Sequence, residues 1–409
     1  MSQKTKILGA LFIALASASV LGSYEMVRSP TTVLFKATFG THYLPVVMAI
    51  IPLAVIAVVY LYGILLSYLG PRKTLFTTTL GSAVIIGLSY WAHHAGFKFA
   101  SAFLYVFRQA YIVILIEQYW SFINSTFDQK IARKLNGPIA GISSIGAVLG
   151  GIFVGKYAQN FGAAELILGA SVFLLPAAFL SDIAYRICGE PKASHTEQEG
   201  KKGHLHLSLF KTSPLLSLLF GIILTTQMFS VFLSLIFQNI LQDMIPNVNA
   251  QTAYLGNFYA TVNGVAAFFQ FIAAPIFMSI FPIHIIHLAI PLLHLVMAGL
   301  LMYSPTLALA GAAFLIFKSV DYSIFRASKE VLYIPLSFDA RYRAKEMIDV
   351  FGYRFGKGAT SLGITLIQSA GLILTPFFTW GALMATALWV GLIFPIVKYM
   401  PRRMKEPTV

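Results

Sequence analysis

Residues 7–26 read ILGALFIALASASVLGSYEM, a run of 20 residues with one charged side chain, Glu25, near its end. A helix of that length covers about 30 Å, which is the thickness of the hydrocarbon core of a bilayer. The run is too long for the apolar region of a secretory signal peptide, and no small-residue cleavage site is evident before the polar turn near residues 28–30. We therefore expect a retained first membrane helix that ends close to Arg28.

The composition extends this expectation to the whole chain. Of the 409 residues 57% are hydrophobic and 11% are charged, and the mean hydropathy is +0.77. A soluble domain could not bury so much apolar surface, and the alternation of a membrane β-barrel is absent. The net charge of +14 is scattered between and within the apolar runs, which speaks against a soluble nucleic-acid-binding domain. The class predicted is an all-α membrane protein.

Twelve apolar runs are long enough to span a bilayer as helices. Lys and Arg gather after the second, fourth, sixth, tenth and twelfth runs, so the positive-inside rule places both termini in the cytoplasm. We predict an N-terminal six-helix bundle at 1–187, a cytoplasmic linker at 188–208 and a C-terminal six-helix bundle at 209–409. The predicted spans cover residues 7–27, 43–69, 74–95, 99–122, 136–158, 164–186, 212–241, 250–280, 284–303, 306–330, 346–370 and 375–398.

The two halves carry signs of duplication. Two parallel six-helix repeats around a cavity at the membrane midplane are the arrangement of the major facilitator fold, which works by alternating access. We therefore predict this fold. The landmarks that recur at one offset of 211 residues are Tyr43-Leu44 with Tyr254-Leu255, Pro71 with Pro282, Phe127-Asp128 with Phe338-Asp339, and Lys134 with Lys345.

Ionisable side chains inside membrane helices are costly and usually face a water-filled path, a partner or a solute. Arg28 follows Glu25 by three residues, so the two share a helix face and can pair, either beside a cavity or at the membrane surface. Arg108 lies within an apolar run and its guanidinium fork suits a carboxylate or phosphate. We expect Arg28 and Arg108 to contact a solute, and Glu117 is a candidate for proton coupling.

A stripe of uncharged polar residues marks the run 212–241. Gln227, Ser230 and Ser234 follow one another at spacings of three and four, which places them on one helix face. Asn263 adds an amide in the next run. These groups either bind a solute or only satisfy backbone carbonyls and neighbouring helices.

The segment 318–358 is the richest in charge. Lys318 can neutralise Asp321 or a solute anion, and two cations project from one side of a glycine-flanked helix near residue 355. A purely structural network of these charges is the alternative. The solute-binding candidates here are Lys318, Asp321, Tyr322, Tyr353, Arg354 and Lys357, and the candidates for proton coupling are Asp321 and Asp349.

Catalytic motifs are missing from the sequence. There is no metal-ligand cluster, no phosphate-binding glycine loop of a nucleotide hydrolase and no nucleophile-base arrangement. We expect no enzyme activity, no cofactor and no metal. The partners expected are a small-molecule substrate and the lipid bilayer, without nucleic acid, for a protein that works as a monomer.

Residues 318–358 resemble the nucleotide translocase (ATP:ADP antiporter) family of plastids and bacteria, a branch of the major facilitator superfamily. The resemblance implies uptake or exchange of nucleotides across a bacterial inner membrane, with Lys and Arg holding the phosphates. The matching residues are Lys318, Lys329-Glu330, Tyr333, Pro335-Leu336, Lys345, Ile348-Asp349, Gly352, Arg354 and Gly356-Lys357.

The chain departs from the family pattern in two places. Thr31 and Thr32 stand where the family usually has a Lys-Asp pair, and uncharged residues occupy the positions of a glutamate and lysines in the run 212–241. Fewer cations are then left to grip a triphosphate. Two functions stay open: a transporter of a nucleotide or other phosphorylated metabolite, and a proton-coupled importer of a neutral solute such as a polyol, sugar or nucleoside.

Overall fold

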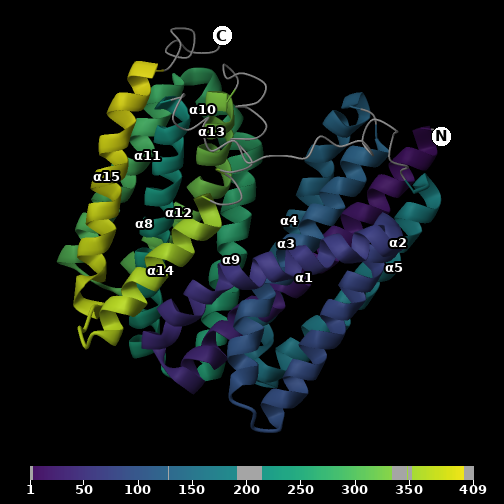
Figure 1. Cartoon of the computed structure of the whole chain (residues 1–409), viewed down its shortest axis with the longest axis horizontal. Helices are drawn as coiled ribbons and strands as arrows, with labels where there is room; N and C mark the ends of the chain where they lie inside the picture. The colour runs from purple at the N-terminus through teal and green to yellow at the C-terminus, as the bar shows by residue number, and fades with distance from the viewer. Residues whose placement is uncertain (1–2, 128, 191–213, 334–347, 349–351, 400–409) are drawn as a thin grey trace. The chain divides into compact units, whose positions relative to one another are not determined.

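The structure is a computed structural model that describes residues 3–127, 129–190, 214–333, 348 and 352–399 (Figure 1). All regular secondary structure in these ranges is helical, which confirms the predicted all-α class. Ten of the helices there are long and apolar enough to cross a membrane. Residues 191–208 of the predicted linker and Asp349 lie outside the described ranges.

Helix α1 (Gln3–Phe39) is longer than the sequence predicts, because it continues through Pro30. A proline inside a helix removes one backbone hydrogen bond, and side-chain donors can satisfy carbonyls nearby. Thr31 Oγ1 donates to the carbonyl of Val27 at 2.7 Å, and Thr32 Oγ1 to the carbonyl of Arg28 at 2.8 Å. The predicted end of the helix near Arg28 was therefore wrong, and Arg28 lies well inside α1.

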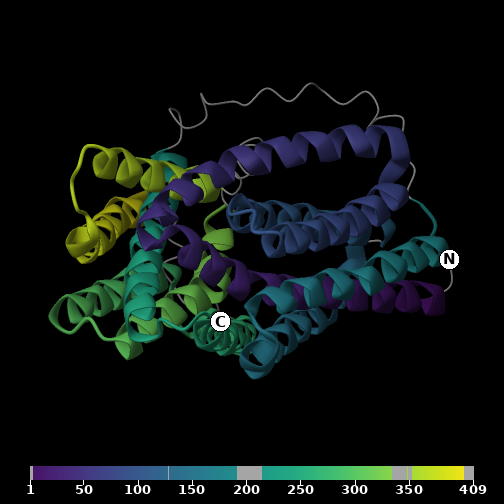
Figure 2. The same ribbon diagram turned by 90° about the horizontal axis from the view of Figure 1, so that it is seen from below.

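Helix α2 (Leu44–His94) contains two of the predicted spans. Gly70, with φ 73° and ψ 168°, interrupts the helix directly before Pro71. Only glycine adopts this left-handed region without strain, so the break coincides with the predicted boundary between the runs 43–69 and 74–95. Figure 2 shows the sharp turn of α2 at this kink.

Small residues let the N-terminal helices approach closely. Besides α1 and α2 these are α3 (Phe99–Thr126), α4 (Gln129–Phe161) and α5 (Ala163–Cys188), and α1 packs along both α4 and α5. A Cβ at Gly146 or Gly150 of α4 would collide with the backbone of α1. Ser23 of α1 donates to the carbonyl of Ala170 in α5 at 2.8 Å. Such small-residue contacts and hydroxyl bonds are typical of membrane helix packing.

In the described part of the second half, the predicted spans 250–280 and 306–330 each contain a π-helical segment. Helix α9 (Val248–Phe268) runs into η2 (Phe269–Ala273) and α10 (Ala274–Ile280), and α12 (Leu307–Val320) runs into η3 (Asp321–Phe325) and α13 (Arg326–Tyr333). The segments η2 and η3 contact each other. The remaining elements are η1 (Thr41–Tyr43), α8 (Pro214–Met244), α11 (Ile283–Tyr303), α14 (Tyr353–Ser369), η6 (Thr375–Phe377) and α15 (Phe378–Tyr399).

The chain divides into two compact units. Unit 1 comprises Met1–Tyr43, Ile50–Gly200 and Ile245–Gly264, and unit 2 comprises Leu44–Ala49, Lys201–Met244 and Val265–Val409. In unit 2 the helices α8, α11 and α15 pack side by side around buried rings that include Phe229, His294 and Trp389 (Figure 1). Each of the twelve predicted spans coincides with helical structure, whereas the domain boundaries 1–187, 188–208 and 209–409 stay a prediction.

Candidate functional site

Unit 1 contains a buried ion pair in the middle of α1. Arg28 Nη1 lies 3.0 Å from Glu25 Oε1, one helical turn away, and the two side chains are 13% and 4% exposed. Such burial excludes the alternative of a loose pair at the membrane surface, which would leave both groups hydrated. The sequence predicted that Arg28 could pair with Glu25, and the structure shows this pair; Arg28 stays a predicted solute-binding residue.

Arg108 of α3 joins this pair through the backbone. Its Nη1 donates to the carbonyl of Arg28, and its guanidinium carbon lies 4.3 Å from the ring centre of Tyr105. The side chain is buried, and its Nε has no hydrogen-bond partner within the described part of the chain. Arg108 thus stabilises α1 close to Pro30 and still has an unsatisfied donor.

Two residues of α9 complete the site from the other half of the sequence. Asn263 Nδ2 donates to Glu25 Oε1 at 3.0 Å, and the guanidinium carbon of Arg28 lies 3.5 Å from the ring centre of Tyr259. Tyr259 and Asn263 are four residues apart and therefore share a helix face. We call these residues the arginine cluster; its members are Glu25, Arg28, Arg108, Tyr259 and Asn263.

Glycines bring α9 close enough to α1 and α3 for these contacts. On α4, Gly151 and Gly155 lie four residues apart and face Gly256 and Ala260 of α9, which have the same spacing. A Cβ at Gly256 would lie 2.6 Å from the backbone nitrogen of Gly155, so no larger residue fits. Matching small residues at this spacing allow membrane helices to pack backbone against backbone.

The charges of the arginine cluster do not cancel. Two guanidinium groups face one carboxylate, and Glu25 Oε2 is buried without a hydrogen-bond partner among the described residues. A buried excess cation is expensive unless an anion or water compensates it, and a buried carboxylate with a bare oxygen is a natural proton acceptor. The cluster can therefore bind an anion, exchange a proton, or couple the two events.

Unit 2 contains a second group of buried polar side chains. Lys318 of α12 is buried beside the rings of Phe314 and Phe317, and its Nζ donates to Ser230 Oγ of α8 at 3.1 Å. Gln227 is buried and donates to its neighbour Thr226 at 3.1 Å. Ser230 in the polar stripe of α8 thus contacts Lys318 of α12.

Asp321 and Tyr322 lie in the π-helical segment η3. Asp321 is buried and its Oδ1 has no hydrogen-bond partner in the described ranges, whereas Tyr322 is 38% exposed. A π-helical turn shifts the phase of the side chains that follow it, and such turns are frequent at functional sites. The sequence singled out Asp321, but it offered no sign that the helix widens there.

Helix α14 approaches α8 through two further glycines, Gly352 and Gly356. A Cβ at Gly356 would lie 3.0 Å from the Cβ of Gln227, which places the start of α14 against the polar stripe. Lys329 of α13, which the sequence did not single out as a solute ligand, is buried with its Nζ 5.0 Å from the ring centre of Tyr353. Three predicted residues lie half-buried in this first part of α14, namely Tyr353, Arg354 and Lys357.

Two further predicted residues, Glu117 and Ser234, take no part in the contacts described above. Glu117 is exposed on α3, so the structure offers Glu25 in its place as the buried carboxylate of unit 1. Ser234 is half-buried one turn beyond Ser230 on α8. Asp349 lies outside the described residues.

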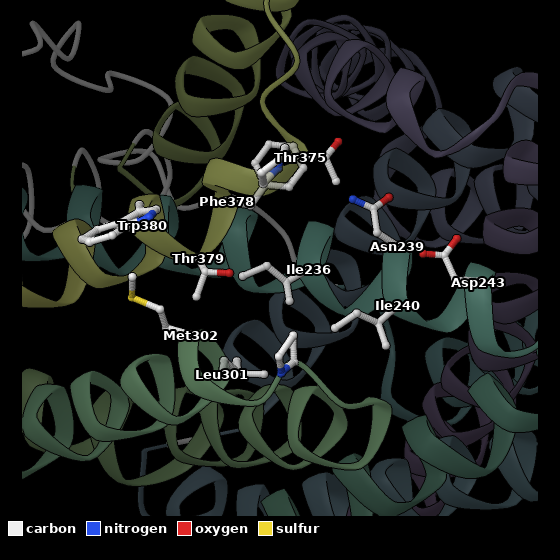
Figure 3. A pocket seen from close by; sticks show the side chains of 12 residues that line it. Ile236, Asn239, Ile240, Asp243, Leu301, Met302, Thr375, Phe378, Thr379 and Trp380 are labelled. Carbon is white, nitrogen blue, oxygen red and sulfur yellow. The ribbon is translucent and has the colours of Figure 1, made fainter.

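A pocket of about 390 Å³ opens at the ends of α8, α11 and α15 (Figure 3). Asn239 and Asp243 enter it from α8, and Thr379 and Trp380 from α15. None of the predicted site residues lines this pocket, and most of its lining is apolar. It therefore does not contribute to the candidate site.

The C-terminal half of the chain matches a known protein family. Residues 202–401 match the family model described as "TLC ATP/ADP transporter". This half of the chain is similar to the TLC ATP/ADP transporter family. The resemblance predicted from residues 318–358 is thereby confirmed. The ADP,ATP carrier protein 1 of Rickettsia conorii is 41% identical over 80 residues, which are 20% of this chain and 15% of that protein.

A longer match joins the chain to a related carrier of the same name. The ADP,ATP carrier protein 1 of Rickettsia bellii is 30% identical over 178 residues, or 38% of this chain and 34% of that carrier. The chain thus spans about a third or less of the length of the curated relatives it matches.

Solved structures show the fold of the whole chain. A crystal structure of a single-residue mutant of the nucleoside transporter NupG matches 97% of this chain and 100% of its own with a TM-score of 0.65 at 15% identity. The D-xylose-proton symporter matches 98% of each chain with a TM-score of 0.61 at 15% identity. These likenesses confirm the major facilitator fold, and the chain is a multi-pass membrane protein.

Proposed function

We propose that the chain is a secondary active transporter that moves a nucleotide or another phosphorylated metabolite by alternating access. The observation that carries this proposal is the arginine cluster, in which two guanidinium groups, Arg108 buried and Arg28 13% exposed, face one carboxylate. The match of residues 202–401 to the ATP/ADP transporter family model supports the same substrate class. A phosphate would add negative charge to a cluster whose own members are two arginines and one glutamate.

The candidate residues have distinct roles in this proposal. Arg28 and Arg108 offer guanidinium groups that can hold phosphate oxygens in a bidentate manner, whereas Lys318 offers a point charge. Arg354 and Lys357 extend the cationic set of unit 2. Glu25 holds Arg28 in place when no anion is bound, and either Glu25 or Asp321 can accept a proton. The hydrogen-bonding groups proposed beside them are Gln227, Ser230, Ser234, Asn263, Tyr322 and Tyr353, with Asp349 and Glu117 as further carboxylates.

A second candidate is a proton-coupled importer of a neutral polar solute. The observation that favours it is that Arg28 is already neutralised by Glu25 and stacked on Tyr259, and that the buried stripe on α8 is uncharged. In that case the cations are structural, and hydroxyl groups of a polyol, sugar or nucleoside bind Gln227 and Ser230. A bare carboxylate such as Glu25 or Asp321 then carries the proton.

We propose that this transporter lies in a bacterial inner membrane. The charge distribution of the sequence places both termini in the cytoplasm, with two six-helix bundles at 1–187 and 209–409 joined by a cytoplasmic linker. We expect it to work as a monomer, without enzyme activity and without nucleic acid.

A thermal-stability screen of the purified protein separates the two candidates. Nucleotides, sugar phosphates and inositol are added in turn, and a ligand that binds the folded state raises the melting temperature. The nucleotide proposal expects stabilisation by a phosphorylated ligand that disappears in Arg108→Gln and persists in Lys156→Gln, which changes an exposed lysine of α4. Stabilisation by inositol alone would favour the second candidate.

A further inference from the structure

A second charged site lies far from the arginine cluster along the helices, where α2 bends and α5 ends. Asp182 of α5 pairs with two arginines: Arg72 Nε lies 2.7 Å from Asp182 Oδ1, and Arg186 Nε lies 2.7 Å from Oδ2. The carboxylate of Glu190 accepts the backbone N–H of Arg72 at 3.0 Å. This network fixes the turn at Gly70 against the end of α5.

Beside the network lies a pocket of about 280 Å³. Its polar lining includes Lys73, Asp182 and Arg186, and its apolar lining includes the rings of Phe76 and Phe179, which meet edge to face at 5.7 Å. All of these residues belong to unit 1. The pocket thus has a charged end and an apolar end.

The cations at the charged end outnumber the carboxylate. Asp182 is already shared by Arg72 and Arg186, whose side chain is 66% exposed, so the outer nitrogens of Arg186 point to the surroundings. Lys73 is exposed and forms no ion pair within the described part of the chain. An anion placed between Lys73 and Arg186 would meet one cation without an ion pair among the described residues and the outer nitrogens of a second that shares Asp182 with Arg72.

The order of these residues along the helices matches the layers of a bilayer. Lys73 follows the kink that separates two spans, and Arg186 lies in the last turn of α5, so both stand where helices leave the membrane. Phe76 and Phe179 lie deeper, Phe179 by seven residues or about 10 Å from Arg186. Lipid phosphates and acyl chains have this same vertical order.

We propose that the pocket between α2 and α5 binds an anionic phospholipid, with the phosphate held by Lys73 and Arg186 and an acyl chain against Phe76 and Phe179. Basic pockets between membrane helices are suited to acidic headgroups. A soluble phosphate would satisfy the two cations but would leave the two rings uncovered. The lipid satisfies both ends of the pocket, and it would brace the turn at Gly70.

Titration of the full chain in detergent with defined lipids tests this proposal. Native mass spectrometry counts bound phosphatidylglycerol, with phosphatidylcholine as the neutral comparison and inorganic phosphate as the soluble anion. We expect phosphatidylglycerol to bind more tightly than phosphatidylcholine and to raise the melting temperature, whereas inorganic phosphate leaves it unchanged. Equal stabilisation by inorganic phosphate would overturn the lipid proposal in favour of a soluble anion.

Variants locate the bound lipid. Since a basic residue near a membrane surface contributes about 1 kcal/mol, each cation removed should weaken phosphatidylglycerol binding roughly fivefold. Lys73→Gln and the double variant with Arg186→Gln should show this loss, while Lys98→Gln, an exposed lysine before α3, should keep the original affinity. Lys73→Gln alone serves if the double variant does not fold, because Lys73 has no ion pair to lose among the described residues. Unchanged binding in Lys73→Gln would exclude the site.

Discussion

At the scale of single residues, the structure explains why charges persist in an apolar chain. Glu25 accepts hydrogen bonds from Arg28 and from Asn263, each at 3.0 Å. Because Asn263 lies 238 positions further along the chain, Glu25 connects α1 with α9. Each partner lowers the cost of burying the other, but the second guanidinium of Arg108 leaves the balance positive. The residues that form the proposed substrate site are therefore also structural, and variants must be judged on stability before transport.

Replacement of Glu25 by glutamine tests this double role. The amide keeps the shape but removes the carboxylate that faces Arg28 and Arg108, and loss of one partner of a buried pair costs about 3–5 kcal/mol. We expect a clear drop in melting temperature for Glu25→Gln, and partial recovery in the double variant Glu25→Gln/Arg28→Gln, because one of the two positive charges that faced the carboxylate is then removed as well. If Glu25→Gln is as stable as the parent protein, the ion pair makes no net contribution to the stability of the fold.

Replacement of His294 by phenylalanine should change the stability in the opposite direction. Its ring is buried in unit 2, stacks on Trp389 with ring centres 5.8 Å apart, and has no hydrogen-bond partner for Nδ1 within the described ranges. Burial of an unsatisfied nitrogen is unfavourable, whereas a phenyl ring of similar size keeps the aromatic contacts. His294→Phe should therefore fold with equal or higher melting temperature, and His294→Ala should lose about 2–4 kcal/mol through the cavity it creates. A strongly destabilised His294→Phe would indicate a polar role for this ring.

At the scale of elements, the sequence predicted where helices lie better than how they are shaped. Span positions follow from hydrophobic length, which the bilayer dictates, and the break at Gly70-Pro71 follows from the conformational limits of glycine and proline. The continuation of α1 through Pro30 was missed because it depends on donors from Thr31, Thr32 and Arg108. The π-helical segments were missed because no local pattern encodes them.

The arginine cluster depends on the close contact between helices α4 and α9. Leucine at Gly155 would collide with the amide of Asn257, so Gly155→Leu should push α9 away from α4. At Gly141, on the same helix, a Cβ would meet nothing within 4 Å, so Gly141→Leu serves as the matched control. In a Cys188→Ser background, the pair Val148→Cys and Gly264→Cys reports the approach, because a Cβ at Gly264 would lie 4.0 Å from Val148 Cγ2. We expect cross-linking to survive Gly141→Leu and to fall several-fold with Gly155→Leu; equal yields would refute a backbone-to-backbone contact.

At the scale of the whole molecule, the fold and the family could be predicted from one sequence, but the site only in part. Composition, twelve spans and the motif residues between Lys318 and Lys357 sufficed for the major facilitator fold and the ATP/ADP transporter relationship. The candidate cations Arg28, Arg108 and Lys318 were found because ionisable residues are rare in apolar runs. The contacts of Arg28 with Tyr259 and of Lys318 with Ser230 were not predicted, because contacts between distant helices leave no trace in local spacing.

Coupling is the property that only the intact transporter can reveal. If the substrate is a nucleotide held by the arginine cluster, an incoming nucleotide replaces an outgoing one of the same charge, so exchange needs no net movement of protons. In liposomes that contain the purified protein, internal nucleotide should accelerate uptake of labelled nucleotide about tenfold or more, and a protonophore should leave the rate unchanged. That acceleration should vanish in Arg108→Gln, which must first be shown to fold, and persist in Lys156→Gln. Uptake that collapses with the protonophore and ignores internal nucleotide would instead assign Glu25 or Asp321 to proton transfer, and with it the neutral solute.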